Sequence, residues 1–220
     1  TDNLINQGLI KGKTVDLTAL HDIKNEGGQI AGQSRVNLQA GDSLISTATT
    51  KGDETNQWIN RGAAIYLTEP DGEIALKATR NLELTATDIL AGGNSRVLLN
   101  AGENIELGTI NTVRQENIDW DSKNYLHKTT QKEIGSRLYA GDITLQSGED
   151  IHLTATDIQA TGLLGLHAGN DISLNSGYSS IDQIAHSVTK DKSFGSSETR
   201  TTHAEIHNKQ ATGSLLKGNE

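Results

Sequence analysis

The chain has 220 residues, of which 34% are hydrophobic and only 3% aromatic, with one Phe and 23 glycines. A compact globule normally fills its centre with larger side chains, so this composition favours a narrow core of aliphatic residues. The net charge of −9 disfavours nucleic acid as a partner, because phosphates bind basic surfaces. The absence of cysteine excludes disulfides and thiolate metal sites. The sequence contains neither a long apolar run nor a signal-peptide pattern. We therefore expect either a protein that stays inside the cell or an interior segment of a longer protein.

Short strands are predicted throughout the chain by one recurring element, a β-branched or Leu residue, a polar residue and then Leu. This spacing places both apolar side chains on one face of a strand and the polar one on the other. The pairs are Val15/Leu17, Val36/Leu38, Ile74/Leu76, Leu82/Leu84, Val97/Leu99, Ile143/Leu145, Ile151/Leu153, Leu164/Leu166 and Ile172/Leu174.

Corners follow several of these strands, as at Ala40–Asp42, Ala101–Glu103, Ser147–Glu149 and Ala168–Asn170, where a small residue, Gly and an acidic or polar residue succeed one another. Gly accepts positive φ, and Asp or Asn bonds its own backbone, so these are turns. Short strands with frequent corners predict an all-β fold, a single-stranded, right-handed parallel β-helix with rungs about 4.8 Å apart. An antiparallel sandwich would need a broader core and two-residue hairpins, whose Asn-Gly and Asp-Gly signals are scarce here.

A longer period overlies the short one. LTATDI occurs at Leu84–Ile89 and Leu153–Ile158, with a looser copy, LTALHDI, at Leu17–Ile23. We interpret the three as one rung in successive super-repeats. Between them lie polar, Thr-rich stretches at about 47–72, 108–141 and 175–211, which are too long for ordinary connections. We therefore expect residues 1–220 to form one β-helix segment whose three hairpin excursions project from one side as a stacked ribbon.

The opening of the chain resembles the haemagglutinin repeats of filamentous haemagglutinin-like exoproteins. Residues 25–32, NEGGQIAG, and 40–42, AGD, carry the match best. The long insertions are similar to the second repeat region of contact-dependent growth inhibition (CdiA-type) effectors. The resemblance implies a non-enzymatic segment of a secreted Gram-negative protein. Such a protein crosses the periplasm and a two-partner-secretion transporter in the outer membrane, then helps to deliver a C-terminal toxin across a target cell's outer membrane. A target-cell receptor and neighbouring repeats are implied partners, and a rigid adhesin stalk is the alternative function.

The aromatic residues are the candidate contact residues, because all of them fall in the expected excursions or at their edges. They either clamp the hairpins onto the coil or meet a membrane or partner surface, where Trp and Tyr are favoured. These residues are Trp58, Tyr66, Trp120, Tyr125, Tyr139, Tyr178 and Phe194.

Other polar groups are weaker candidates. His203, Glu205 and His207 alternate on one strand face, which we interpret as an exposed polar face and not as a metal site; the remaining histidines are scattered, with His152 pointing outward. Asp88 and Asp157 occupy equivalent positions, as do the corner residues Asp42, Glu103 and Asn170. A catalytic cluster should break the repeat period, and these acids follow it. We therefore expect no catalytic residue, no cofactor and no calcium ladder.

Overall fold

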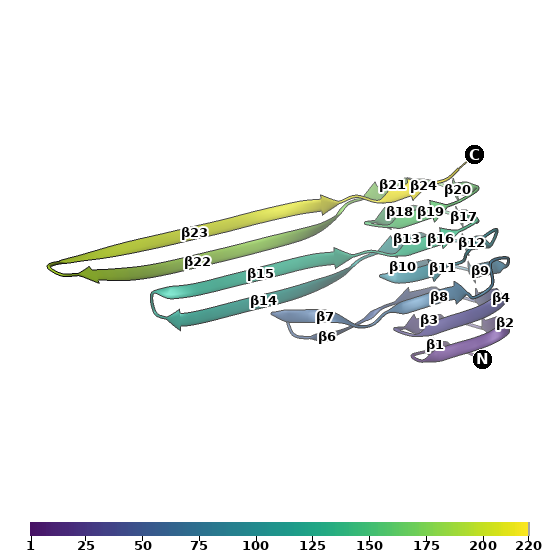
Figure 1. Cartoon of the computed structure of the whole chain (residues 1–220). Coiled ribbons are helices and arrows are strands. Elements are labelled where there is room, and N and C mark those ends of the chain that lie inside the picture. Colours follow the sequence, from purple (N-terminus) through teal and green to yellow (C-terminus); the bar gives the residue numbers. More distant parts are fainter. Residues whose placement is uncertain (220) are drawn as a thin grey trace.

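Short strands wind into a parallel β-helix in the computed structural model, which describes residues 1–219 (Figure 1). The fold is all-β, and no helix long and apolar enough to cross a membrane occurs in that range. One stack of seven parallel strands forms one side of the coil. In spatial order these strands are β1 (Leu4–Asn6), β3 (Ile23–Glu26), β5 (Leu44–Thr47), β10 (Leu82–Thr85), β13 (Ile105–Gly108), β18 (Ile151–Thr154) and β21 (Ile172–Asn175).

Two further stacks complete the coil, joined by the long strands β2 (Leu9–Ala19) and β4 (Gln29–Ala40). Residues 29–32 of β4 pair with β8, and residues 35–40 pair with β9, so β4 contributes to both stacks. The second stack continues through β8 (Ala63–Leu67), β11 (Thr87–Leu90), β16 (Arg137–Ala140), β19 (Asp157–Ala160) and β24 (Leu215–Lys217). The third continues through β9 (Glu73–Ala78), β12 (Arg96–Ala101), β17 (Asp142–Ser147) and β20 (Leu164–His167).

The interior of the coil is narrow and aliphatic, as the composition predicts. Every buried hydrophobic residue in the described range is Ala, Val, Ile or Leu. Leu82, Ile105 and Ile151 stack in register on successive rungs with no exposed surface, and each such side chain contributes about 1.5–3 kcal/mol by its burial. In the last rung, by contrast, Ile172 and Leu174 are 42% and 49% exposed. A rung is therefore buried by its neighbours and not by its own turn.

Buried polar side chains form a ladder at one corner of the coil. The Asn6 amide donates to Asn25 Oδ1 at 2.8 Å, and Asn25 Nδ2 donates to Ser46 Oγ at 3.1 Å. On the next rung the Thr87 hydroxyl donates to the Ser46 carbonyl at 2.7 Å. Because buried polar groups without partners are costly, this ladder keeps the corner dry and stable while the chain changes direction.

Three antiparallel hairpins leave the coil at this corner. They are β6 (Thr49–Gly52) with β7 (Asn56–Arg61), β14 (Ile110–Asp121) with β15 (Asn124–Ile134), and β22 (Gly177–Ser193) with β23 (Ser196–Thr212). The hairpins follow β5, β13 and β21, and between them β10 and β18 lead directly to β11 and β19. From β5 onward, therefore, hairpins arise from alternate rungs.

The two LTATDI motifs occupy the tight corners of the intervening rungs. Leu84 and Leu153 lie in the first stack, and after each of them the chain turns directly into the second stack. The turn residues Ala86 and Ala155 have φ of 47° and 46° and are the only non-glycine residues with positive φ in the described range. The motif therefore recurs because the same sharp corner recurs between hairpins.

The third copy of the motif was interpreted wrongly. Leu17 lies in β2 and pairs with Leu38 of β4, whereas Leu84 and Leu153 lie in the other stack. LTALHDI has one residue more than LTATDI, so its apolar residues fall in other strands of the coil. Its last residue, Ile23, begins a strand of the first stack, whereas the equivalent Ile89 of LTATDI lies in the second stack.

The hairpins are shorter than the stretches expected from the sequence. Residues 63–67 and 137–140, which we had placed in the excursions, return to the coil as β8 and β16. Their alternating burial shows why, since Ala63, Ile65 and Leu67 point inward while Ala64 and Tyr66 point outward. The polar, Thr-rich composition of the preceding hairpin obscured this short apolar alternation.

Gly135, where the second hairpin returns to the coil, provides a test of how tightly the next rung covers the corner. A Cβ added there would lie 1.9 Å from the Ala155 carbonyl oxygen, whereas Gly213, at the return of the third hairpin, has open space. We predict that Gly135→Ala lowers the free energy of unfolding by about 1–3 kcal/mol, as overpacking does. Gly213→Ala should change it by less than about 0.5 kcal/mol. Equal effects of the two variants in denaturant titrations would contradict this packing.

Candidate interaction surface on the hairpin sheet

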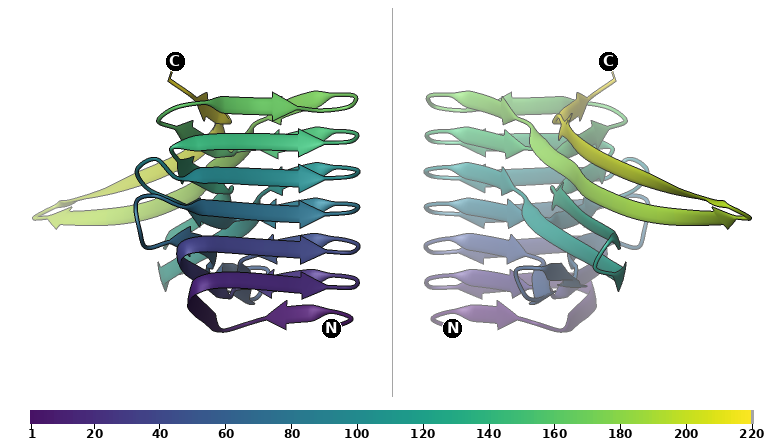
Figure 2. Two further views of the ribbon diagram at one scale, coloured as in Figure 1. Left: turned by 90° about the vertical axis from the view of Figure 1, so that its right-hand side faces the viewer. Right: turned by 90° about the vertical axis from the view of Figure 1, so that its left-hand side faces the viewer.

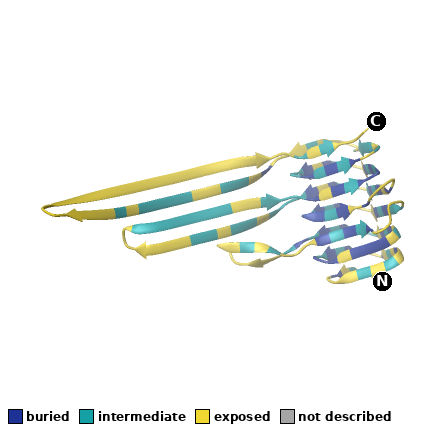
Figure 3. Ribbon diagram, in the orientation of Figure 1, coloured by how far each residue is buried: buried dark blue, intermediate teal, exposed yellow. Residues whose placement is uncertain are grey.

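The three hairpins join into one six-stranded antiparallel sheet, in the order β23-β22-β15-β14-β7-β6. Figure 1 shows this hairpin sheet projecting from one side of the coil, with hairpins that lengthen toward the C-terminus, and Figure 2 shows the stacked rungs with the hairpins foreshortened. Of the residues in its six strands only Gly177 is buried, and Figure 3 shows the same contrast with the coil. The sheet is therefore a single layer whose two faces are both open to contact.

Each hairpin carries a large exposed aromatic ring at or near its tip. Trp58 and Trp120 are 50% and 65% exposed, and Phe194, in the turn between β22 and β23, is fully exposed. Exposed rings of this size gain free energy where they can enter an apolar or interfacial environment. These exposures leave much of each ring free to contact a partner.

Two of the seven candidate aromatics do not belong to the hairpin sheet. Tyr66 lies in β8 and Tyr139 in β16, both half-buried on the outer side of the coil. The Tyr139 hydroxyl donates a hydrogen bond to Asp157, which raises the pKa of this tyrosine. These two residues therefore belong to the coil, and five aromatics remain on the hairpins: Trp58, Trp120, Tyr125, Tyr178 and Phe194.

Histidines that are scattered in the sequence come together on one face of the hairpin sheet. Tyr125 pairs with His186, and His186 with His203, across three strands. The Tyr125 and His186 rings stack with centroids 5.5 Å apart, and the His186 and His203 centroids are 5.9 Å apart. His127, two residues from Tyr125 along β15, lies on the same face, and its Nε2 is 2.8 Å from Asp119 Oδ1. Strand register thus brings together His127 and His186, which are scattered in the sequence, and His152 is exposed, as expected.

His203, Glu205 and His207 lie on this same face, on the edge strand β23. Glu205 Oε1 is 2.9 Å from His203 Nε2, and this contact lowers the pKa of the Glu205 carboxyl. His207 Nδ1 is 2.9 Å from Asp182 Oδ1, which raises the pKa of His207. Throughout residues 1–219 no group of three or more His, Asp or Glu side chains has the arrangement of a metal site. Glu205 thus forms exposed contacts with both histidines along β23, and His207 alone reaches across to Asp182 on β22.

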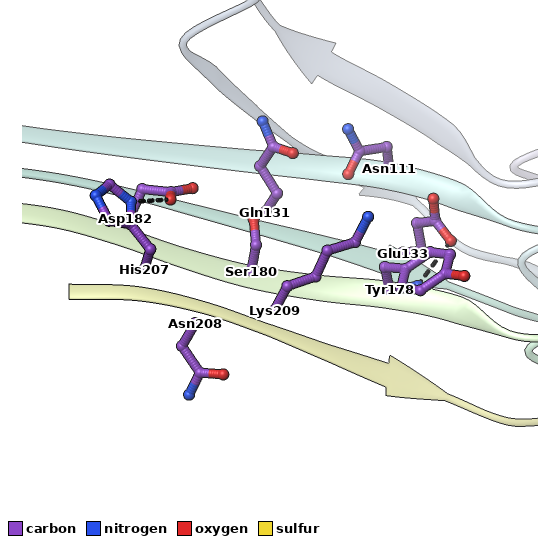
Figure 4. Close-up of a pocket in the computed structure, with 9 residues that line it drawn as sticks. All are labelled: Asn111, Gln131, Glu133, Tyr178, Ser180, Asp182, His207, Asn208 and Lys209. Carbon is purple, nitrogen blue, oxygen red and sulfur yellow. Dashed lines mark hydrogen bonds and ion pairs between the residues drawn. The ribbon is translucent and has the colours of Figure 1, made fainter.

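A shallow polar groove of about 330 Å³ lies on the same face, nearer the coil (Figure 4). The Tyr178 ring forms part of its lining, and Lys209 Nζ lies 4.1 Å from the ring centroid. Glu133 accepts a hydrogen bond from the Tyr178 backbone amide at 2.9 Å. Amides from Asn111 and Gln131 complete a lining of aromatic, amide and charged groups, which is a chemistry suited to polar ligands.

Acidic residues of the coil follow the rung period, as expected. Asp88 and Asp157 flank Arg137 in one column, and Arg137 binds both carboxylate oxygens of Asp88, at 2.8 and 2.6 Å. On the first stack, Glu83 pairs directly with Glu106. Burial and then the charges of Glu106 and Asp22 raise the pKa of Glu83. These arrangements follow from in-register stacking, which places equivalent side chains beside one another.

The corner acids behave in the same way. The backbone amides of Asp42 and Glu103 donate to the carbonyls of His21 and Arg80 on the preceding rungs, at 3.0 and 2.9 Å, and that of Asn170 donates to Glu149 at 2.9 Å. These residues are therefore equivalent corners of successive turns, and the Asp42 and Glu103 carboxylates contact His21 and Arg80 of the preceding rungs.

Comparison with known proteins decides the family. Residues 119–220 match the family model of the haemagglutinin repeat. These residues belong to the haemagglutinin repeat family. The match contains the second half of the second hairpin, the whole third hairpin and the rungs between them.

The chain also resembles CdiA proteins along nearly its whole length. It is 26% identical over 226 aligned residues to "tRNA nuclease CdiA" of Escherichia coli O6:K15:H31 (strain 536 / UPEC), covering 98% of this chain and 7% of that protein. It is 29% identical to "Deoxyribonuclease CdiA" of Dickeya dadantii (strain 3937), covering 95% of this chain and 6% of the relative. The chain thus spans a small part of these relatives. No solved structure matches it significantly.

His207 provides a test of the ion pairs on the hairpin sheet. Because contact with Asp182 raises the pKa of His207 above its ordinary value, the ion pair is complete in acid and is lost as the pH rises through the folded-state pKa. We predict that Asp182→Ala lowers the His207 pKa in an NMR titration. Asp191→Asn, farther along β22, should leave it unchanged. An unaltered His207 pKa in Asp182→Ala would show that the two strands do not hold this register.

Proposed function

We propose that this chain is a non-enzymatic β-helical segment of a secreted bacterial exoprotein. In this proposal it acts in the delivery of a C-terminal toxin across the outer membrane of a target cell during contact-dependent growth inhibition. The haemagglutinin repeat and the similarity to CdiA proteins support the type of protein. The observation that carries the proposed role is the hairpin sheet, a single layer that places exposed aromatic rings at three successive tips.

The coil and the hairpin sheet have different tasks in this proposal. Inward side chains of the coil fill a core, and its backbone groups pair between rungs. The hairpin sheet buries almost none of its residues, so its side chains are free to meet a partner. Trp and Tyr are favoured at the level of lipid headgroups, and large rings dominate protein interfaces. We therefore assign contact with the target outer membrane, or a receptor in it, to Trp58, Trp120, Tyr125, Tyr178 and Phe194.

The producing cell supplies the other proposed partners. Export through the periplasm and an outer-membrane two-partner-secretion transporter suits a chain without cysteine, since stray disulfides would block passage in the unfolded state. The exposed Ile172 and Leu174 of the last rung support neighbouring repeats as partners, because a further rung would bury them.

A rigid adhesin stalk is the second candidate function. The polar groove beside Tyr178 favours it, since an aromatic ring among amides and charged groups is suited to binding a sugar. In that function the hairpin sheet would hold the cell surface without taking part in delivery.

The test replaces the three tip rings in the full exoprotein, as Trp58→Ala, Trp120→Ala and Phe194→Ala together. We predict that killing of target cells falls at least about tenfold while cell attachment persists, and that the isolated segment loses no more than about 0.5 kcal/mol of stability for each exposed ring. The control is Leu20→Ala with Leu163→Ala, because these leucines are 68% and 63% exposed on the coil and not on the hairpins.

The outcomes separate the alternatives. Loss of attachment together with killing would favour the adhesin. A large fall in melting temperature, with killing merely following it, would show that the tip rings are structural. Killing reduced equally by the control would mean that exposed apolar residues act without regard to the hairpin sheet.

A further inference from the structure

An apolar slot of about 690 Å³ lies between the first and second hairpins. Strands β7 and β14 pair only at Gln57–Val113 and Asn56–Arg114. Toward the coil they diverge, so residues 58–61 form no ladder with residues 110–112. This divergence opens the slot at the base of the hairpin sheet.

The walls of the slot are mostly hydrocarbon. Trp58 and Ile59 line one side, and Val113 and Ile134 line the other. Trp58 keeps half its surface exposed although the slot lies beside it. Such a site is suited to an apolar group that can lie against the indole ring.

The two charged side chains that line the slot are both cations. Its lining contains Arg114 and Lys132 but no carboxylate, although the chain as a whole carries a net charge of −9. Arg114 contacts Glu116 at 2.7 Å, but both side chains are well exposed, and exposed ion pairs contribute little. Lys132 has no ion pair within residues 1–219. The slot therefore offers Lys132 to a negatively charged group, together with Arg114, which a headgroup would share with Glu116.

The opposite face of the sheet makes the contrast clear. Neighbouring residues of a strand point to opposite faces, so Glu133 lines the polar groove of Figure 4 while Lys132 lines the slot. The groove also contains Asp182, which would repel an anion. Alternation along β15 thus separates an acid-bearing face from a basic, apolar one.

We propose that the slot binds a single-chain anionic amphiphile, with the acyl chain against Trp58 and Ile134 and the headgroup on Arg114 and Lys132. This inference deepens the proposed contact with an outer membrane by naming the class of lipid that the hairpin sheet recognises. Because binding of a monomeric amphiphile can fail while toxin delivery persists, the two proposals fail separately.

The experiment measures Trp58 fluorescence in the folded 220-residue chain, in a Trp120→Phe background that leaves one tryptophan. The probe is the anionic lipid lauroyl-lysophosphatidylglycerol, used below its critical micelle concentration. Its binding is compared with that of the zwitterionic phosphocholine analogue, which has the same acyl chain and no net charge. We expect a saturable blue shift at one amphiphile per chain, and binding of the choline analogue at least about tenfold weaker. Arg114→Gln with Lys132→Gln should weaken binding of the anionic probe by at least about tenfold.

Lys209→Gln is the matched control, since it removes a cation from the other face. It should leave binding unchanged. Circular dichroism confirms that each variant remains folded, as expected for exposed side chains. No saturable shift, equal affinity for the two headgroups, or equal weakening by Lys209→Gln would each overturn the inference.

Discussion

The distance between hydrogen-bonded strands controls the whole architecture. Strands of a sheet lie about 4.8 Å apart, so each rung of the coil advances by this amount. A hairpin contains two strands and therefore occupies about twice that distance along the coil axis. Hairpins that leave alternate rungs, as those after β5, β13 and β21 do, have the spacing at which neighbours pair into one sheet. Hairpins on every rung would collide, and hairpins on every third rung would leave their edges unpaired.

The same constraint explains the repeated hexapeptide. Each rung between two hairpins must turn without an insertion, and it does so at Ala86 and Ala155 with positive φ. The following Thr87 and Thr156 donate their hydroxyls to backbone carbonyls of neighbouring rungs. LTATDI is thus the sequence of the corner on the rung that separates two hairpins. Its second alanine, Ala86 or Ala155, has a side chain small enough for the αL conformation.

How far the sequence predicts this structure depends on the range of the interactions. Pairs such as Val97 and Leu99 predict the coil because inward residues repeat within one strand. Strand β8 was assigned to a hairpin because Ala63–Leu67 follows a polar stretch closely. The cluster of Tyr125, His186 and His203 requires a register between β15 and β22, which belong to different hairpins, and no local pattern specifies it. The slot beside Trp58 likewise depends on where β7 stops pairing with β14.

Function divides along the same lines. The coil could be inferred as a repeat architecture, while the properties of the hairpin sheet arise from alternation across both of its faces. One face gathers imidazoles and carboxylates, and the other combines Arg114 and Lys132 with aliphatic residues. A single layer can present two different surfaces because it has no core of its own to fill.

Disulfide cross-linking between the second and third hairpins tests the central claim most directly, because the chain has no cysteine to interfere. Gln131 opposes Ser180, and Thr130 opposes Ile181. Adjacent pairs of an antiparallel ladder alternate between wide and close spacing, so one of these two is of the close type that a disulfide can bridge. If the hairpins form one sheet, one of the two opposed pairs, replaced by cysteines, should form an intramolecular disulfide in high yield. The control variant, Gln131→Cys with Ser187→Cys, should not. If neither opposed pair forms a bond more readily than this control, the hairpins do not form one sheet, and the proposed match between rung spacing and hairpin spacing is wrong.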